Sequence, residues 1–253
     1  MTQPAVDGLR VSDIGGHPLQ GGGWFRSGLV FRISGGLVAG PEIAHLDAIG
    51  LRVLVDLRGI DEDRSALIDW ARSRGVAYRE EPIPLVNAAD FAAVLGDGGL
   101  TEADGRAYLE MLYRRVLDEF SASLVGAVSA IAAAQPAGFG CAAGKDRTGL
   151  LTALVQDVLG VDRSTILAGY VSHAPDPDRL LEAIGTWWDW KEGDLATPGL
   201  GAILSAVEEV MAGALEYLDE RHDGSVRYLE AAGLPGKTFD LLRARLVSDR
   251  PQG

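Results

Sequence analysis

The residues whose types and spacing could carry out chemistry lie together in one stretch, Cys141-Ala142-Ala143-Gly144-Lys145-Asp146-Arg147-Thr148-Gly149. Five residues separate the cysteine from the arginine, and small residues at 142–144 let the chain wrap tightly. The backbone N–H groups of such a turn converge on one anion, and a helix starting at Arg147 adds partial positive charge there. We therefore predict a substrate-binding phosphate loop, lined by Ala142, Ala143, Gly144, Lys145 and Thr148.

The polar side chains of this loop have predicted roles in phosphoryl transfer. A positive field stabilises a thiolate, so Cys141 is expected to attack phosphorus in line and form a phosphocysteine. Arg147 is expected to hold two phosphoryl oxygens in bidentate fashion and to stabilise the transition state. Thr148 is expected to donate a hydrogen bond to the sulfur as the leaving group departs. Lys145 either binds an additional charge on the substrate or is a solvated side chain.

Two other interpretations of the stretch, a buried structural cysteine and a Walker A loop, fit the sequence less well. A lone cysteine is more often a small buried hydrophobic residue, but Gly, Lys, Arg and Thr would then stand at matching positions before a helix by accident. A Walker A loop is excluded, because Phe139 and Asp146 occupy places where that motif needs Gly and then Ser or Thr. The catalytic interpretation of Cys141 is therefore favoured.

Two aspartates are candidates for the general acid that protonates the leaving oxygen. Asp146 lies inside the loop, and Asp56 ends a predicted parallel strand, where ligand crevices form in open α/β sheets. The plainer interpretations are that Asp146 braces the loop and that Asp56 pairs with Arg58. Arg58 is also a candidate substrate-binding residue. Arg26 and Arg32 are expected to be surface charges or, less favoured, to line the mouth of the pocket.

The elements that must position the loop alternate between strands and helices. Residues 53–57 form a short apolar run around Asp56 that includes the β-branched Val53 and Val55, which predicts a buried parallel strand. A helix at 61–73 and a strand at 76–79 follow, so an α/β sheet is expected. Residues 138–140 would form the strand that leads into Cys141, although two glycines make it a poor one. A helix at 147–159 follows the loop, whereas residues 1–40 are predicted to be loops and short irregular strands.

The rest of the chain is predicted to be mainly helical. Thr101 and Asp104 have the spacing of a capping box, and a nearly all-apolar helix is expected at 122–134. Two amphipathic stripes at 180–188 and 203–218 predict a helical hairpin inserted at 176–219. Its tryptophans, Trp187, Trp188 and Trp190, are expected to pack within that hairpin. A last helix is expected at 237–247.

Composition bounds the class of protein. The 253 residues, 47% hydrophobic, suit a single domain with a sizeable core, and the net charge of −13 opposes binding to nucleic acid or to anionic membranes. No run approaches the roughly 18 apolar residues of a membrane span, and residues 1–8 lack a signal-peptide pattern, so a cytoplasmic location is expected. The single cysteine excludes an internal disulfide, and the histidines lack metal-ligand spacing. Neither a metal nor a cofactor is expected; the predicted partner is a phosphorylated peptide or small molecule.

The loop also resembles a known family. Gly-Lys-Asp-Arg-Thr-Gly after Cys141 looks like the bacterial tyrosine and phosphoinositide phosphatases typified by mycobacterial protein tyrosine phosphatase B. Residues 12–16, 50–58, 228–234 and 242–246 are similar to flanking parts of that family. The resemblance implies a protein-tyrosine-phosphatase-like α/β fold, a helical lid at 176–219 over the pocket, and Asp146 as the general acid, which we favour over Asp56.

One position departs from the family pattern. Gly140 stands directly before the nucleophile, where the family has a histidine that helps to hold the loop. The expected activity is hydrolysis of a phosphomonoester: phosphotyrosine, a phosphoinositide head group or a small phosphorylated metabolite. The alternative is a phosphatase-like pseudoenzyme that binds phosphorylated ligands without turnover.

Overall fold

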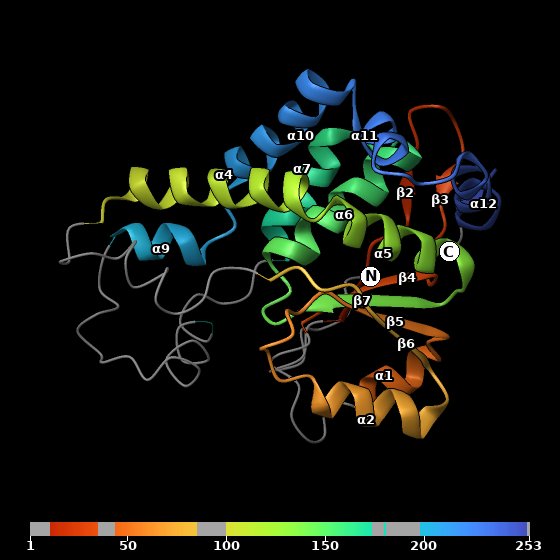
Figure 1. The fold of residues 1–253 in the computed structure, drawn as a ribbon. Helices are drawn as coiled ribbons and strands as arrows, with labels where there is room; N and C mark the ends of the chain where they lie inside the picture. The colour runs from red at the N-terminus through yellow and green to blue at the C-terminus, as the bar shows by residue number, and fades with distance from the viewer. Residues whose placement is uncertain (1–10, 35–43, 85–99, 174–179, 181–197, 252–253) are drawn as a thin grey trace.

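The computed structural model describes residues 11–34, 44–84, 100–173, 180 and 198–251. Figure 1 shows a central sheet with one small and one large layer of helices on its two sides. This layered α/β arrangement is the predicted fold class. The first stripe of the predicted hairpin, 180–188, lies outside the described residues except for Leu180.

The central sheet has five strands in the order β1-β4-β7-β5-β6. Strands β4, β7, β5 and β6 pair in parallel, and β1 pairs with β4 in the antiparallel direction. The strands that were predicted at 53–57, 76–79 and 138–140 are β5, β6 and β7. The bounds of the five are β1 (Val11–Asp13), β4 (Val30–Ser34), β5 (Val53–Asp56), β6 (Ala77–Glu80) and β7 (Ala137–Cys141).

Segment 138–140 forms part of the central strand β7 in spite of its two glycines, and the structure shows why Gly138 is needed there. A Cβ added at Gly138 would lie 2.7 Å from a methyl group of Leu51 and 2.8 Å from one of Ile33. The missing side chain is therefore what lets residues of both flanking segments close over β7. Phe139, between the two glycines, is fully buried in the main core.

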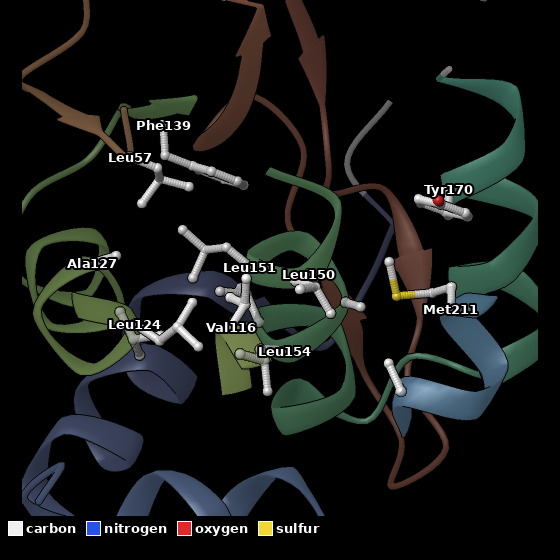
Figure 2. Packing of buried hydrophobic residues seen from close by; sticks show 14 of the residues in the cluster. Leu57, Val116, Leu124, Ala127, Phe139, Leu150, Leu151, Leu154, Tyr170 and Met211 are labelled. Carbon is white, nitrogen blue, oxygen red and sulfur yellow. The ribbon is translucent and has the colours of Figure 1, made fainter. Parts of the chain in front are cut away.

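The two faces of the sheet bury two separate cores because strand residues alternate in direction. Val53, Val55 and Phe139 face the large helical layer, in the cluster shown in part in Figure 2. Ile33 and Leu54 belong to a smaller cluster. That second cluster is covered by α1 (Ala44–Ile49) and α2 (Ser65–Arg74), which lie below the sheet in Figure 1.

The large layer contains helices that the sequence largely predicted. The capping box of Thr101 and Asp104 is present at the start of α4, and Asp162 caps α7. Helix α6 begins one residue earlier than predicted, at Asp146. The helices of this layer are α4 (Glu102–Glu119), α5 (Ser121–Ala133), α6 (Asp146–Leu159), α7 (Arg163–Ser172), α9 (Pro198–Leu204), α10 (Glu208–His222), α11 (Ser225–Ala231) and α12 (Gly236–Leu246).

The prediction that the amphipathic stripe at 203–218 lies on one continuous helix is wrong. It is divided between α9 and α10, whose axes differ by 59°. The carbonyl oxygens of Ile203 and Ser205, at the break, accept hydrogen bonds from the Lys145 ammonium instead of continuing a helical ladder. The break therefore belongs to the surroundings of the phosphate loop.

A second, three-stranded sheet joins the two ends of the described chain. It is formed by β2 (His17–Pro18), β3 (Trp24–Phe25) and β8 (Val247–Ser248) in that order. Within the described ranges, no single helix has both the length and the apolar character needed to cross a membrane. Two bent pairs, α4 with α5 and α9 with α10, pass that test only when each pair is taken together.

Candidate active site

The predicted phosphate loop lies between the end of β7 and the start of α6. Gly144 has φ of 72°, a left-handed conformation that favours glycine, and a Cβ there would lie 2.7 Å from Oγ of Ser34. The Gly144 carbonyl accepts a hydrogen bond of 2.6 Å from Nη2 of Arg32. Arg32 is 4% exposed, so the prediction of a surface charge is wrong for this residue. It braces the loop from β4.

The predicted nucleophile is buried at the start of the loop. Cys141 ends β7, and Oγ1 of Thr148 donates to its Sγ at 3.1 Å. Thr148 is on the first turn of α6 and is fully buried, which fixes the direction of its hydroxyl. The structure thus brings together the thiol and the hydroxyl that the sequence predicted to support it.

Arg147 is held at the base of the same loop by a carboxylate and two carbonyls. Its Nη2 lies 3.0 Å from Oε1 of Glu62, and Nη1 donates to Oε2 of the same carboxylate and to the carbonyls of Ile83 and Leu57. Burial lowers the pKa of Arg147, but the charges of Cys141 and Glu62 outweigh it and the net pKa is raised. Nε of Arg147 is buried and has no hydrogen-bond partner among the described residues.

Glu62 is a site residue that the sequence did not reveal. It lies in the loop between β5 and α2, and its Oε2 also accepts a hydrogen bond of 2.7 Å from the Gly59 backbone N–H. The chain has 36 acidic residues, and no spacing distinguishes this one from the others. Its proximity to Arg147, 85 residues away, is set by the pairing of β5 with β7.

Asp146 accepts two hydrogen bonds on one of its oxygens. The Tyr113 hydroxyl lies 2.8 Å and the Lys145 Nζ 2.6 Å from Oδ1. A second tyrosine hydroxyl, of Tyr170, lies 2.7 Å from that of Tyr113. Burial, followed by the charge of Asp146, raises the pKa of Tyr113 well above its ordinary value. The phenol therefore stays neutral and acts as a donor to the carboxylate.

Lys145 is buried, so of its two predicted alternatives the solvated side chain is wrong. It is 2% exposed, and its Nζ contacts the Asp146 carboxylate and the carbonyls of Ile203 and Ser205. Burial lowers the pKa of this lysine, but Asp146 and Tyr170 raise it by more, so the group stays charged. Three acceptors match the three N–H groups of the ammonium.

The structure places Asp56 as the partner of Arg58. Nε of Arg58 lies 3.0 Å from Oδ1 and Nη2 lies 2.6 Å from Oδ2, and Tyr78 also donates to Oδ2. Both side chains are almost fully buried. Burial lowers the pKa of Arg58, but Asp56 reverses this and raises it overall. The pair lies next to the nucleophile strand, because Leu57 N donates to Gly140 O.

The position before the nucleophile has no room for a side chain. A Cβ on Gly140 would lie 2.2 Å from the carbonyl oxygen of Ile33, on the neighbouring strand β4. Any larger residue would therefore push β4 away from β7. The loop is braced by the Arg32 contact described above.

Comparisons with known proteins identify the family of this chain. A model of the tyrosine phosphatase family matches residues 9–248. The triple specificity protein phosphatase PtpB of Mycobacterium tuberculosis is 29% identical over 129 residues, which cover 47% of this chain and 47% of that protein. This chain therefore matches only about half the length of the mycobacterial relative. A tyrosine-protein phosphatase of Nostoc commune is 27% identical over 211 residues, 79% of this chain and 68% of that protein.

Solved structures give a weaker likeness. The core catalytic domain of a PP-IP phosphatase from S. cerevisiae covers 66% of this chain and 84% of its own, at 14% identity and a TM-score of 0.35. TpbA of P. aeruginosa covers 70% and 87%, at 19% identity and a TM-score of 0.34. The family model, in contrast, extends over nearly the whole sequence. The chain therefore belongs to the tyrosine phosphatase family.

Proposed function

We propose that this protein hydrolyses phosphomonoesters in two steps through a phosphocysteine on Cys141. The observation that carries the proposal is Nε of Arg147, a buried donor that finds no acceptor in the described part of the chain and lies beside the loop that begins at Cys141. A buried unpaired N–H is costly, and a phosphoryl oxygen bound in the loop would supply the missing acceptor. A charge-assisted bond of this kind strengthens as negative charge develops in the transition state.

The first step transfers the phosphoryl group to sulfur. The Cys141 thiolate attacks phosphorus, the S–P bond forms as the P–O bond breaks, and Asp146 gives its proton to the leaving oxygen. In the second step, Asp146 accepts a proton from water, whose oxygen attacks phosphorus and releases the thiolate. Thr148 stabilises that thiolate through its hydrogen bond to Sγ.

The surroundings of the two aspartates favour Asp146 as the acid. Its side chain retains 17% exposure, and both hydrogen bonds that it accepts from the described residues reach Oδ1, so we assign the catalytic proton to Oδ2. The Asp56 side chain is 1% exposed, and Arg58 and Tyr78 occupy its two oxygens. An acid must reach the leaving group, and Asp146 is the more accessible of the two.

The proposed substrates are phosphotyrosine, a phosphoinositide head group or a small phosphorylated metabolite. The net charge of −13 favours a peptide or a metabolite over a lipid in an anionic membrane. Lys145 would bind an additional substrate charge only by exchanging one of its present acceptors. The proposed lid, 176–219, includes α9, and Ile203 of α9 together with Ser205 just after it supplies two of these acceptors.

The test uses the fact that Cys141 is the only cysteine. Iodoacetate should inactivate the wild-type protein with one label per chain, and inorganic phosphate should slow the labelling because it occupies the same loop. Cys141→Ser should lose turnover of p-nitrophenyl phosphate yet keep anion binding, whereas Arg147→Ala should lose both. Normal hydrolysis by Cys141→Ser would overturn the mechanism. A wild-type protein that binds phosphate and hydrolyses no substrate would instead be the pseudoenzyme.

A further inference from the structure

A cavity of about 460 Å³ lies at the edge of the central sheet opposite the phosphate loop. Leu29, Arg52 and Gln135, which line it, come just before the starts of β4, β5 and β7, whereas Cys141 is at the other end of β7. A strand rises about 3.3 Å per residue, so the cavity and the nucleophile are roughly 20 Å apart. One phosphate group cannot reach both places.

Three arginines from distant parts of the chain line this cavity. Arg26 follows β3, Arg52 precedes β5, and Arg245 is in the last turn of α12. No aspartate or glutamate is among the described residues that line it, and none of the three arginines forms an ion pair within the described ranges. In a chain with a net charge of −13, three uncompensated guanidinium groups in one cavity are unexpected.

Helix ends account for only part of this cluster. Nη1 of Arg245 donates to Ala133 O at the end of α5 and to Oε1 of Gln135, and Nη1 of Arg26 donates to Arg245 O near the end of α12. Such contacts cap exposed carbonyls. They do not explain Arg52, which has no side-chain partner in the described part of the chain. They also leave Nε of Arg26 buried without an acceptor there.

We propose that this cavity binds a compact anion with several phosphate-type charges, at a site separate from the catalytic loop. A guanidinium has five N–H donors in a planar fork that suits phosphate oxygens, and most donors of these three groups are unused. A single phosphate carries a charge of about −1.5 to −2, so a chain of two or three phosphates matches three arginines better. The volume is within the roughly 300–1,000 Å³ of small-molecule pockets.

The experiment measures binding of inorganic tripolyphosphate by calorimetry, at fixed ionic strength, to protein saturated with vanadate. Vanadate occupies the phosphate loop, so the heat reports the second site. We expect one equivalent to bind. Arg52→Gln should weaken it at least about tenfold, because charge-assisted hydrogen bonds are lost. Arg243→Gln is the matched control. It also removes one exposed positive charge, from the last turn of α12 near Arg245 but outside the cavity, and it should leave binding unchanged.

Two results would overturn the proposal. The first is the absence of tripolyphosphate binding to the vanadate-saturated protein. The second is an equal loss of affinity in Arg52→Gln and Arg243→Gln, which would mean that overall charge is responsible. Arg52 is exposed, so its replacement should leave both the fold and the hydrolysis of p-nitrophenyl phosphate intact. The experiment therefore tests the second anion site independently of the proposed catalytic mechanism.

A parallel titration with a nucleoside triphosphate identifies the source of the ligand. Equal affinity for it and for tripolyphosphate would support recognition of the phosphate chain alone. Tighter binding of the nucleotide would support a phosphorylated metabolite whose organic part contacts the apolar lining beside Leu29. Both results support an anion site, and in Arg52→Gln the affinity for both ligands should fall at least about tenfold.

Discussion

The hydroxyl of Tyr113 lies 2.8 Å from Oδ1 of Asp146, the oxygen that Lys145 also contacts. Tyr113 is on α4 and is fully buried, so its hydroxyl has little freedom to turn elsewhere. The two donors fix the carboxyl plane and keep Oδ1 occupied. Oδ2 is then presented in one orientation, which is what proton transfer to a leaving group needs.

Tyr113→Phe should therefore impair substrates with poor leaving groups. We expect kcat for an alkyl phosphate to fall about tenfold and kcat for p-nitrophenyl phosphate, which scarcely needs a proton, to fall by less than about threefold. KM should change little for either. Tyr228→Phe is the control, because it removes a buried hydroxyl bonded to Leu117 O, away from Asp146. If both variants lose only stability, Tyr113 has no positioning role.

The two candidate acids should differ when each is replaced by asparagine. Asp146→Asn should slow poor leaving groups by about a hundredfold and leave p-nitrophenyl phosphate much less affected. Asp56→Asn should instead lower the free energy of unfolding by about 3 kcal/mol or more, because Arg58 would keep a buried charge without its partner. Rates with a series of leaving groups and denaturant titrations measure the two effects. A leaving-group effect in Asp56→Asn would make the strand-end aspartate the acid.

Glu62→Gln tests whether the carboxylate orients the phosphate clamp. The amide cannot accept two charge-assisted bonds from Arg147, so the guanidinium gains freedom and kcat should fall about tenfold. Glu80→Gln is the control, since Glu80 pairs with Arg64 at the surface. A rise in kcat/KM in Glu62→Gln would contradict this role and identify Glu62 as an inhibitor of substrate binding.

Gly140→Ala should destabilise the protein by about 2 kcal/mol or more, because its Cβ would overlap the Ile33 carbonyl. Restoring the family's histidine should be worse for the same reason. Gly213→Ala is the matched control, because nothing lies within 4 Å of a Cβ at that site in α10. Alanine there should stabilise by about 0.5–1 kcal/mol. Urea unfolding curves of the two variants compare them directly, and equal stability would refute the steric explanation.

Lys145→Met tests the connection between α9 and the loop. Removing the whole of 178–218 is a poor test, because α10 contributes Val210, Met211 and Leu215 to the main core. The methionine variant keeps the volume but frees the carbonyls of Ile203 and Ser205. We expect the ratio of kcat/KM for a bulky phosphopeptide to that for p-nitrophenyl phosphate to increase about threefold or more. An unchanged ratio would mean that α9 does not restrict access.

The local elements of the fold were predictable because their signals are local. The capping box at Thr101 and Asp104 and the apolar run before Asp56 each depend on neighbouring residues. Strand β4 was missed: it lies in a glycine-rich segment, and its place beside β7 depends on pairing across more than 100 residues. The single stripe predicted for α9 and α10 failed for a similar reason, since a lysine 58 residues away holds the break between them.

The same distinction applies to the candidate site. Cys141, Thr148 and Arg147 lie in one contiguous stretch, so their association could be predicted from spacing alone. Glu62 and Tyr113 reach the stretch from other elements, and no pattern of residue types marks them. Arg32 was expected at the surface, and a solvated side chain was one of two alternatives for Lys145, because basic residues are mostly exposed. Their acceptors are backbone carbonyls and a carboxylate that tertiary contacts bring to them.

The central position of β7 has a consequence for how the protein acquires activity as it folds. The nucleophile strand pairs on one side with residues 30–34 and on the other with residues 53–56, so both contacts close long loops. Parallel pairings between distant segments form slowly. After dilution from denaturant, helical signal should therefore return first and phosphate-dependent protection of Cys141 from alkylation should return last. The reactivity of the Cys141 thiol therefore reports the final step of folding.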